Sequence, residues 1–345
     1  MVADAFSQAG WTTVRASRRV GAAPGIQPVD LGSPETLENA LDDVKPDLVV
    51  SAVPDASLTA ERSVIRRGGL IVNVSTLALA DIKRLRQTPG PGDGTAVVYA
   101  GIAPGLSSLL AASLLAGHPD ADEVELAFTV SANGSAGPAG ADAAFASLAG
   151  AGRHRTAPIP LPAPFGRTRG LGFGELDNGW LGPVTDGKTV SSYVCLSPRP
   201  VRYAVLAANA AGLLGRLPRG AMPAKPPGPV AAPSAEPVAH WVAVRRQGSY
   251  LAARTIRATG DYRSSAAITA LFAQALTQPA PALPPGVLFP EEALTLDDIR
   301  PGLAGAGITI VDEHPVTLLC VVCGAYHRKQ HPIMSQRPKP VTGIA

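Results

Sequence analysis

Short apolar runs alternate with amphipathic segments along the first hundred residues. The apolar runs predict strands at residues 11–16, 26–30, 46–54, 69–75 and 95–101. Helices are predicted at residues 2–9, 33–43, 57–67 and 106–115. Ser33 followed by Pro34 is typical of a helix start, and Gly68 ends the next helical segment. Strands that are apolar on both faces and alternate with helices are typical of a parallel sheet covered on both sides. The pattern therefore predicts an α/β fold with a Rossmann-like, doubly wound parallel sheet.

The pattern changes after residue 121. Residues 122–132 alternate as a half-exposed strand does, residues 189–196 predict another strand, and residues 240–258 predict a hairpin that turns at Gln247 and Gly248. Helices are expected at residues 139–150, 201–214 and 262–276, and the Pro/Ala-rich stretch 218–237 is expected to be an exposed linker. The pattern in this half of the chain predicts a second α+β domain with a mostly antiparallel sheet and helices on one face.

Composition narrows the class of protein. The 345 residues are 46% hydrophobic and 17% charged, which is enough for two globular domains. The net charge of +3, without a basic run, argues against a nucleic-acid partner. Three cysteines favour a reducing compartment over a disulfide framework, and no apolar run is long enough for a membrane span. We expect a cytoplasmic protein with a small-molecule substrate.

Two arginines follow the strand expected at residues 11–16. In a Rossmann-like sheet the end of the second strand lies beside the adenosine ribose, where an acidic residue binds the 2′-hydroxyl and arginine accommodates a 2′-phosphate. Ser17, Arg18 and Arg19 offer a hydroxyl and two guanidiniums but no carboxylate. They favour NADP over NAD as the cofactor. A solvated surface turn is the alternative interpretation of the same residues.

The glycine-rich turn of dinucleotide-binding folds is absent from the sequence. No G-x-G-x-x-G occurs, and the nearest imitation, GLGFG at residues 170–174, is expected to be a flexible loop. Without the central first strand, its two neighbours would keep unpaired edges. We therefore expect that the chain begins too late and binds NADPH weakly or not at all. Residues 307–312 and 316–322 are candidates for a substitute strand.

Five ordered stretches carry a family resemblance: VRASRR, VDLGSPETLENAL, DLVVSAVP, GGLIVNVS and VVYAGIAPGLSSLLAASL. Together with residues 260–276 and 284–308, they resemble the NADP-using reductase branch of the saccharopine dehydrogenase-like family. The resemblance implies that Ser17, Arg18 and Arg19 hold the 2′-phosphate. It further implies that Asp30 and Leu31 border the adenine, and that Ala52, Val53 and Pro54 follow the pyrophosphate and nicotinamide side. The turn that would face the nicotinamide consists of Gly101, Ala103, Pro104 and Gly105.

One departure from the family concerns the substrate. True saccharopine reductases resemble each other in an aspartate before the Pro-Gly of this turn, where the present chain has Ala103. The resemblance implies an NADP-dependent oxidoreductase acting on an imine or an amino-acid conjugate. We also expect a homodimer. The alternative is a non-catalytic or truncated remnant that keeps the substrate-domain and interaction surfaces. The expected domains are residues 1–121 for the cofactor, 122–280 for substrate and dimerisation, 281–310 as the family's C-terminal segment, and a tail at 311–345.

No motif marks the catalytic residues. The side chains able to exchange a proton in the second half of the chain are His154, Asp177, Lys188, Tyr193, Tyr262 and Arg263. His154 lies between two arginines, which favours a solvated loop over a catalytic role. In the tail, Cys320, Cys323, His327 and His331 have ligand types that zinc prefers, but their close spacing favours ordinary strand or helix residues, and no metal site is predicted.

Overall fold

The predicted parallel sheet is present and gains a strand from the C-terminal part of the chain. In the computed structural model, β3 (Val49–Ser51), β4 (Leu70–Asn73), β5 (Thr95–Val97) and β12 (Gly286–Leu288) form a sheet in the order β12-β5-β4-β3. Each neighbouring pair is parallel. Ile71, Val72, Ala96 and Val97 are wholly buried, as expected of strands that are covered on both faces.

The structure describes most of the chain up to residue 313. The described residues are 1–18, 25–55, 57–75, 77–87, 94–131, 154–173, 181–185, 187–216, 236–278 and 283–313. All of them belong to one contact unit, Met1–Pro315. Several expectations lie outside these residues: those for Arg19, Asp177, the helix at 139–150, the strand at 316–322 and the cysteine–histidine tail.

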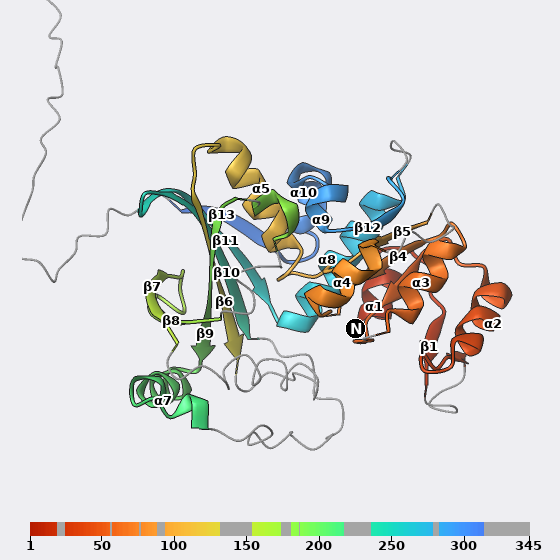
Figure 1. Ribbon diagram of the computed structural model, residues 1–345, viewed down its shortest axis with the longest axis horizontal. Helices are drawn as coiled ribbons and strands as arrows, with labels where there is room; N and C mark the ends of the chain where they lie inside the picture. The colour runs from red at the N-terminus through yellow and green to blue at the C-terminus, as the bar shows by residue number, and fades with distance from the viewer. Residues whose placement is uncertain are drawn as a thin grey trace, which may run out of the picture. The chain divides into compact units, whose positions relative to one another are not determined.

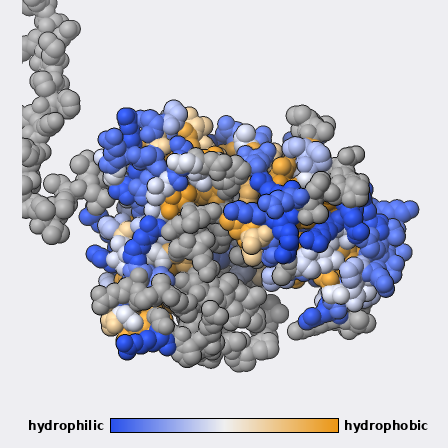
Figure 2. Space-filling view, viewed as in Figure 1, coloured by the Kyte–Doolittle hydropathy of each residue, from blue (hydrophilic) through white to orange (hydrophobic). Residues whose placement is uncertain are grey.

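Helices connect the parallel strands. They are α2 (Pro34–Val44), α3 (Thr59–Arg66), α4 (Leu79–Gln87) and α5 (Leu106–Gly117), of which α4 was not predicted. α2 begins at Pro34, directly after Ser33, as the sequence predicts. It buries Leu37, Ala40 and Leu41 on one side, and Figure 2 shows hydrophilic residues on its outer side at the right of the view. This division of side chains is what holds an amphipathic helix against a sheet.

The first two strands form a separate parallel pair. β1 (Arg15–Ser17) pairs with β2 (Ile26–Pro28), and the described ladder is three residues long. This is why β1 is shorter than the predicted strand at 11–16. Among the described residues, β1 pairs only with β2 and β3 only with β4. The preceding helix, α1 (Val2–Gln8), buries Phe6 against Ala270 and Ala273 of α8 (Asp261–Leu276).

A seven-stranded sheet makes up the second half of the fold (Figure 1). Its order is β13-β11-β10-β6-β9-β8-β7, and only β6 and β9 run parallel to each other. The strands are β6 (Glu123–Ser131), β7 (Thr156–Pro160), β8 (Arg167–Gly172), β9 (Thr189–Ser197), β10 (Pro237–Arg246), β11 (Ser249–Thr259) and β13 (Thr309–Glu313). The β10–β11 hairpin turns at Gln247 and Gly248, both with positive φ, as a tight hairpin requires. The expected mostly antiparallel sheet is confirmed.

Helices pack on one face of this sheet. Val242, Val244 and Ile256 share a buried cluster with residues of α5, α8 and α10 (Leu296–Leu303). Farther along the sheet, α7 (Arg199–Ala210) packs Val205 and Leu206 against another cluster. The remaining short helices are α9 (Pro290–Ala293), η2 (Gly182–Thr185) and η3 (Leu214–Arg216). None of the helices within the described residues has the length and apolar character to cross a membrane.

Two expectations about strands were wrong. Residues 307–312 do not substitute for a missing strand, because β13 pairs with β11 at the edge of the seven-stranded sheet. Residues 170–172 of GLGFG are not a flexible loop but the end of β8. The glycines there permit close packing: a Cβ on Gly170 would lie 2.8 Å from Cβ of Tyr193, and one on Gly172 would lie 2.6 Å from Cγ of Arg155.

Candidate functional site

The carboxyl ends of β3, β4 and β5 lie at one edge of the parallel sheet. The Val74 N–H donates to the Ser51 carbonyl over 2.9 Å, and the Ala100 N–H donates to the Asn73 carbonyl over 2.8 Å. These bonds extend the ladder beyond the strands and keep the following segments side by side. In open α/β sheets, ligands bind outside the carboxyl ends of the strands. Two of the expected cofactor-binding segments, residues 52–54 and 101–105, therefore lie at the edge where a ligand is expected.

The segment from Gly101 to Gly105 is a tight turn that starts α5. The Gly101 N–H donates to the Pro104 carbonyl over 3.2 Å, and the Leu106 N–H donates to the Gly101 carbonyl over 2.9 Å. Gly105 has a φ of 127°, and a Cβ at this position would lie 2.1 Å from the Gly101 carbonyl oxygen. Only glycine fits there. Ala103, between them, is half-buried.

The segment after β3 presents an apolar surface. Ala52, Val53 and Pro54 are all exposed, and Val53 is 52% exposed although it is a large hydrophobic residue. Asp55 follows them and fixes the start of α3, because its carboxylate accepts hydrogen bonds from the backbone N–H of Ser57 (3.0 Å) and of Thr59 (2.8 Å). Burial acts to raise the pKa of Asp55, but the hydrogen bond from the Ser57 hydroxyl and these two backbone hydrogen bonds lower it below its ordinary value.

The residues expected around the adenosine lie on the β1–β2 pair and the turn that follows it. Ser17, at the end of β1, is half-buried, and Arg18 is exposed. The Asp30 carboxylate accepts a hydrogen bond from the Gly32 N–H over 3.0 Å, while Leu31 packs against the apolar cluster beneath α2 and α3. Asp30 and Leu31 thus have local structural roles.

The start of α8 adds titratable groups near the Gly101 turn. Thr269 donates its hydroxyl to the Ala100 carbonyl over 2.8 Å, and Oγ of Ser265 lies 3.6 Å from where a Cβ on Gly101 would be. Asp261, one turn earlier, shares a helix face with Ser265. Its Oδ1 lies 3.9 Å from Nε2 of His240 on β10. Figure 1 shows α8 alongside both sheets, so this helix connects the strand ends to the seven-stranded sheet.

His240 and Asp261 have strongly altered acidities. His240 is 3% exposed and stacks on Phe128 with the ring centres 6.4 Å apart, and neither ring nitrogen has a hydrogen-bond partner among the described residues. Burial lowers the pKa of His240 to about 4. Asp261 is only partly buried, with 37% of its side chain exposed, and this partial burial, followed by the charge of Glu236, raises its pKa to about 6. Altered pKa values near a strand-end ligand edge are typical of functional groups.

The proton-exchanging residues proposed from the sequence differ in their surroundings in the structure. Tyr262 and Arg263 lie beside Asp261 and are exposed. His154 Nδ1 is 3.1 Å from the Gly172 carbonyl oxygen, and Lys188 donates to the Ala121 carbonyl over 2.7 Å, so both bond to backbone. Tyr193 is buried under the Arg155 guanidinium. The sequence analysis missed His240 and Asp261. The lone histidine in an otherwise apolar strand and the GDYRSS stretch were the available signals.

Comparison with known proteins gives distant structural likenesses only. No family model matches the chain, and no curated protein matches it. A homospermidine synthase from Legionella pneumophila, solved in complex with NAD, has a TM-score of 0.46 at 13% identity, over 86% of this chain and 83% of that one. An amine dehydrogenase from Mycobacterium smegmatis has a TM-score of 0.36 at 11% identity, over 80% and 82%. GenD2 from gentamicin A biosynthesis, in complex with NAD, has a TM-score of 0.38 at 13% identity, over 91% and 92%. TM-scores below 0.5 assign no function to this chain.

Proposed function

We propose that this chain is an NADP-dependent oxidoreductase of the saccharopine dehydrogenase-like kind, acting on a small molecule such as an imine or an amino-acid conjugate. One observation carries the proposal. The ends of three adjacent parallel strands lie at one edge, and the helix beside that edge brings Asp261 within 3.9 Å of His240. Ligand-binding strand ends next to a proton-exchanging pair are what hydride-transfer chemistry needs.

The residues at this edge fit a nicotinamide dinucleotide. The glycines at positions 101 and 105 allow the tight turn at this edge, and Val53 supplies exposed apolar surface. Ser17 and Arg18 have the hydroxyl and guanidinium chemistry that suits a 2′-phosphate. When bound, the nicotinamide supplies the hydride donor or acceptor.

The remaining chemistry falls to side chains of this chain. At neutral pH a group with a pKa of about 6 is mostly ionised and one with a pKa of about 4 is neutral, so Asp261 is a carboxylate and His240 an uncharged imidazole. The carboxylate accepts a proton from the substrate heteroatom during oxidation and, once protonated, returns it during reduction. The imidazole lies beside the carboxylate, with Nε2 3.9 Å from Oδ1, and the two groups are not hydrogen-bonded to each other. Asp261 thus supplies the carboxyl group that Ala103 does not.

The cofactor proposal is tested at the adenosine end. We would titrate the 345-residue chain with adenosine 2′,5′-bisphosphate and with adenosine 5′-monophosphate, using saturation-transfer NMR and calorimetry. The 2′-phosphate should improve affinity at least tenfold, because a charge-assisted bond contributes about 1.5–3 kcal/mol. Arg18→Ala should remove this preference, while the matched exposed Arg257→Ala on β11 should keep it. Equal affinity for the two nucleotides would refute NADP preference.

NADPH itself tests the alternative of a non-catalytic protein. No G-x-G-x-x-G occurs in the sequence, and β1 and β3 each keep one unpaired edge among the described residues. These observations favour weak NADPH binding, because backbone N–H groups of the glycine-rich turn ordinarily hold the pyrophosphate. A fluorescence titration should therefore show no saturation in the micromolar range. Saturation at millimolar concentration would agree with a weakly binding enzyme, and no saturation at any concentration would favour the non-catalytic alternative. Micromolar binding would contradict the expected weakness.

A further inference from the structure

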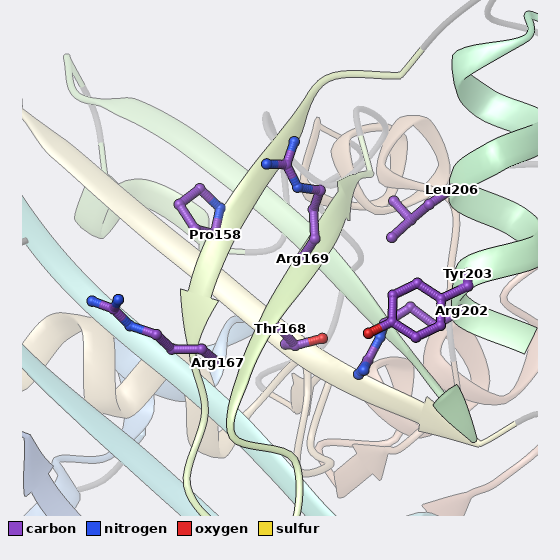
Figure 3. A pocket seen from close by; sticks show the side chains of 7 residues that line it. All are labelled: Pro158, Arg167, Thr168, Arg169, Arg202, Tyr203 and Leu206. Carbon is purple, nitrogen blue, oxygen red and sulfur yellow. The ribbon is translucent and has the colours of Figure 1, made fainter. Parts of the chain in front are cut away.

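A pocket opens where β8 separates from β9. β8 pairs with β7 from Arg167 to Leu171, but with β9 only at Leu171 and Gly172. The earlier part of β8 therefore has no partner strand on its second side among the described residues, and α7 begins there, two residues after β9 ends. The pocket between them has a volume of about 250 Å³ and is lined by Pro158, Arg167, Thr168, Arg169, Arg202, Tyr203 and Leu206 (Figure 3).

Arg202 of α7 is a buried cation in this pocket. The residue is only 7% exposed, and its guanidinium has no hydrogen bond or ion pair to any other described residue. Its guanidinium lies over the ring of Tyr203, whose centre is 5.4 Å from Cζ, and its charge also acts on the thiol of Cys195. A guanidinium carries five N–H donors and stays charged in proteins, so burial without an anion is costly.

Thr168 of β8 is a second unpartnered donor. It is 7% exposed, and its hydroxyl has no hydrogen-bond partner among the described residues. Figure 3 shows this hydroxyl directed toward Arg202 and Tyr203. No lining residue is acidic, and three are arginines, of which Arg169 bonds to Oγ1 of Thr156 over 3.2 Å. The pocket is therefore positively charged and has unused donors.

We propose that this pocket binds a small oxyanion, a carboxylate or phosphate group, through the guanidinium of Arg202 and the hydroxyl of Thr168. The planar fork of arginine matches the spacing of two oxygens on either group. The pocket volume exceeds that of either group alone, so the anion is part of a small organic ligand. The pocket is built from β7, β8 and α7, and contains no residue of the strand-end edge. The inference is therefore independent of the proposed oxidoreductase activity.

The test uses the full 345-residue protein and two probes, inorganic phosphate and acetate, with chloride keeping the ionic strength constant. We expect one probe to raise Tm with a saturable concentration dependence, and the stronger probe identifies the preferred group. Arg202→Met should abolish this rise. Arg199→Met removes the same charge from an exposed position on α7 and should keep it. No saturable rise in the unmodified protein, or the same rise in Arg202→Met, would overturn the proposal.

Two further readouts separate a ligand site from a structural arginine. In buffer without either probe, Arg202→Met should have the same Tm as the unmodified protein or a higher one, because a buried uncompensated charge is removed. A lower Tm, or failure to fold, would show that Arg202 already has a structural partner and would count against the site. Thr168→Val, which keeps the shape of the side chain, should weaken binding of the preferred probe at least threefold. Unchanged affinity would exclude Thr168 as a ligand.

Discussion

The buried imidazole of His240 should make the stability of the fold depend on pH between about 4 and 6.5. In the unfolded chain a histidine binds a proton below its ordinary pKa of about 6.5. In the folded chain, burial lowers the pKa of His240 to about 4. Between these two values the unfolded state binds more protons, so the contribution of His240 to stability is present above pH 6.5 and decreases as the pH falls.

The size of the effect follows from the two pKa values. One unit of pKa difference corresponds to about 1.4 kcal/mol, so His240 should account for a loss of about 3 kcal/mol of unfolding free energy between pH 7 and pH 4. Asp261 acts in the opposite direction, because its raised pKa of about 6 lets the folded state bind the extra proton. The unmodified protein therefore shows the sum of the two effects, and a variant is needed to isolate His240.

Urea unfolding of the unmodified protein and of His240→Asn, measured from pH 4 to pH 8, isolates the histidine. The difference in unfolding free energy between the two proteins should narrow by about 3 kcal/mol from pH 7 to pH 4. Comparing slopes removes the constant cost of the substitution itself. Repeating the pair on an Asp261→Asn background checks whether the neighbouring carboxylate, 3.9 Å away, reduces the effect. A difference that stays constant across this range would show that His240 titrates normally, which would refute its burial without a partner.

Three further predictions concern a turn glycine, a buried carboxyl group and a buried aromatic ring. Gly105→Ala should lower the free energy of unfolding by about 3 kcal/mol or more, because the new Cβ would lie 2.1 Å from a backbone oxygen. The control is Gly187→Ala, at a glycine that also has positive φ but has open space around it, and it should cost only about 1–2 kcal/mol. Thermal or urea unfolding measures both. Glu291→Gln should raise Tm at pH 9 and leave it nearly unchanged at pH 5. Burial raises the pKa of Glu291 to about 8 from an ordinary value of 4.5, so the unmodified protein loses stability as the pH rises between these two values, and the glutamine variant does not. Phe272→Ala should cost about 3–5 kcal/mol in urea unfolding, since the ring is wholly buried.

Local patterns in the sequence predicted those strands, helix starts and turns whose formation depends on residues close together in the chain. Continuous apolar runs placed β3, β4 and β5 correctly, and Ser33 with Pro34 placed the start of α2. The Gln247–Gly248 turn predicted the hairpin because a tight turn between two strands requires positive φ at those positions. The bounds of β1 were less accurate, because its described ladder is limited by the three residues of β2.

Features that depend on distant pairing were not predictable in the same way. β12 joins β5 and β13 joins β11 across long stretches of sequence, and nothing in an apolar run of three to five residues specifies its partner strand. His240 and Asp261 lie on different elements and approach only because α8 packs against the sheet. The pocket at Arg202 depends on β8 separating from β9, which no local pattern signals.

The buried ionisable groups differ in how the fold compensates for their burial, and this difference singles out Arg202. Glu125 is compensated by partners, since it accepts hydrogen bonds of 3.1 Å from Arg245 and from Tyr250. His240 and Glu291 have no such partners among the described residues, but their pKa values of about 4 and about 8 leave both neutral at pH 7. Arginine has no equivalent route, because its guanidinium stays protonated under any physiological condition. Arg202, which has no carboxylate partner among the described residues, therefore stays charged in the pocket that it lines, and the unused hydroxyl of Thr168 in the same pocket favours a bound anion there.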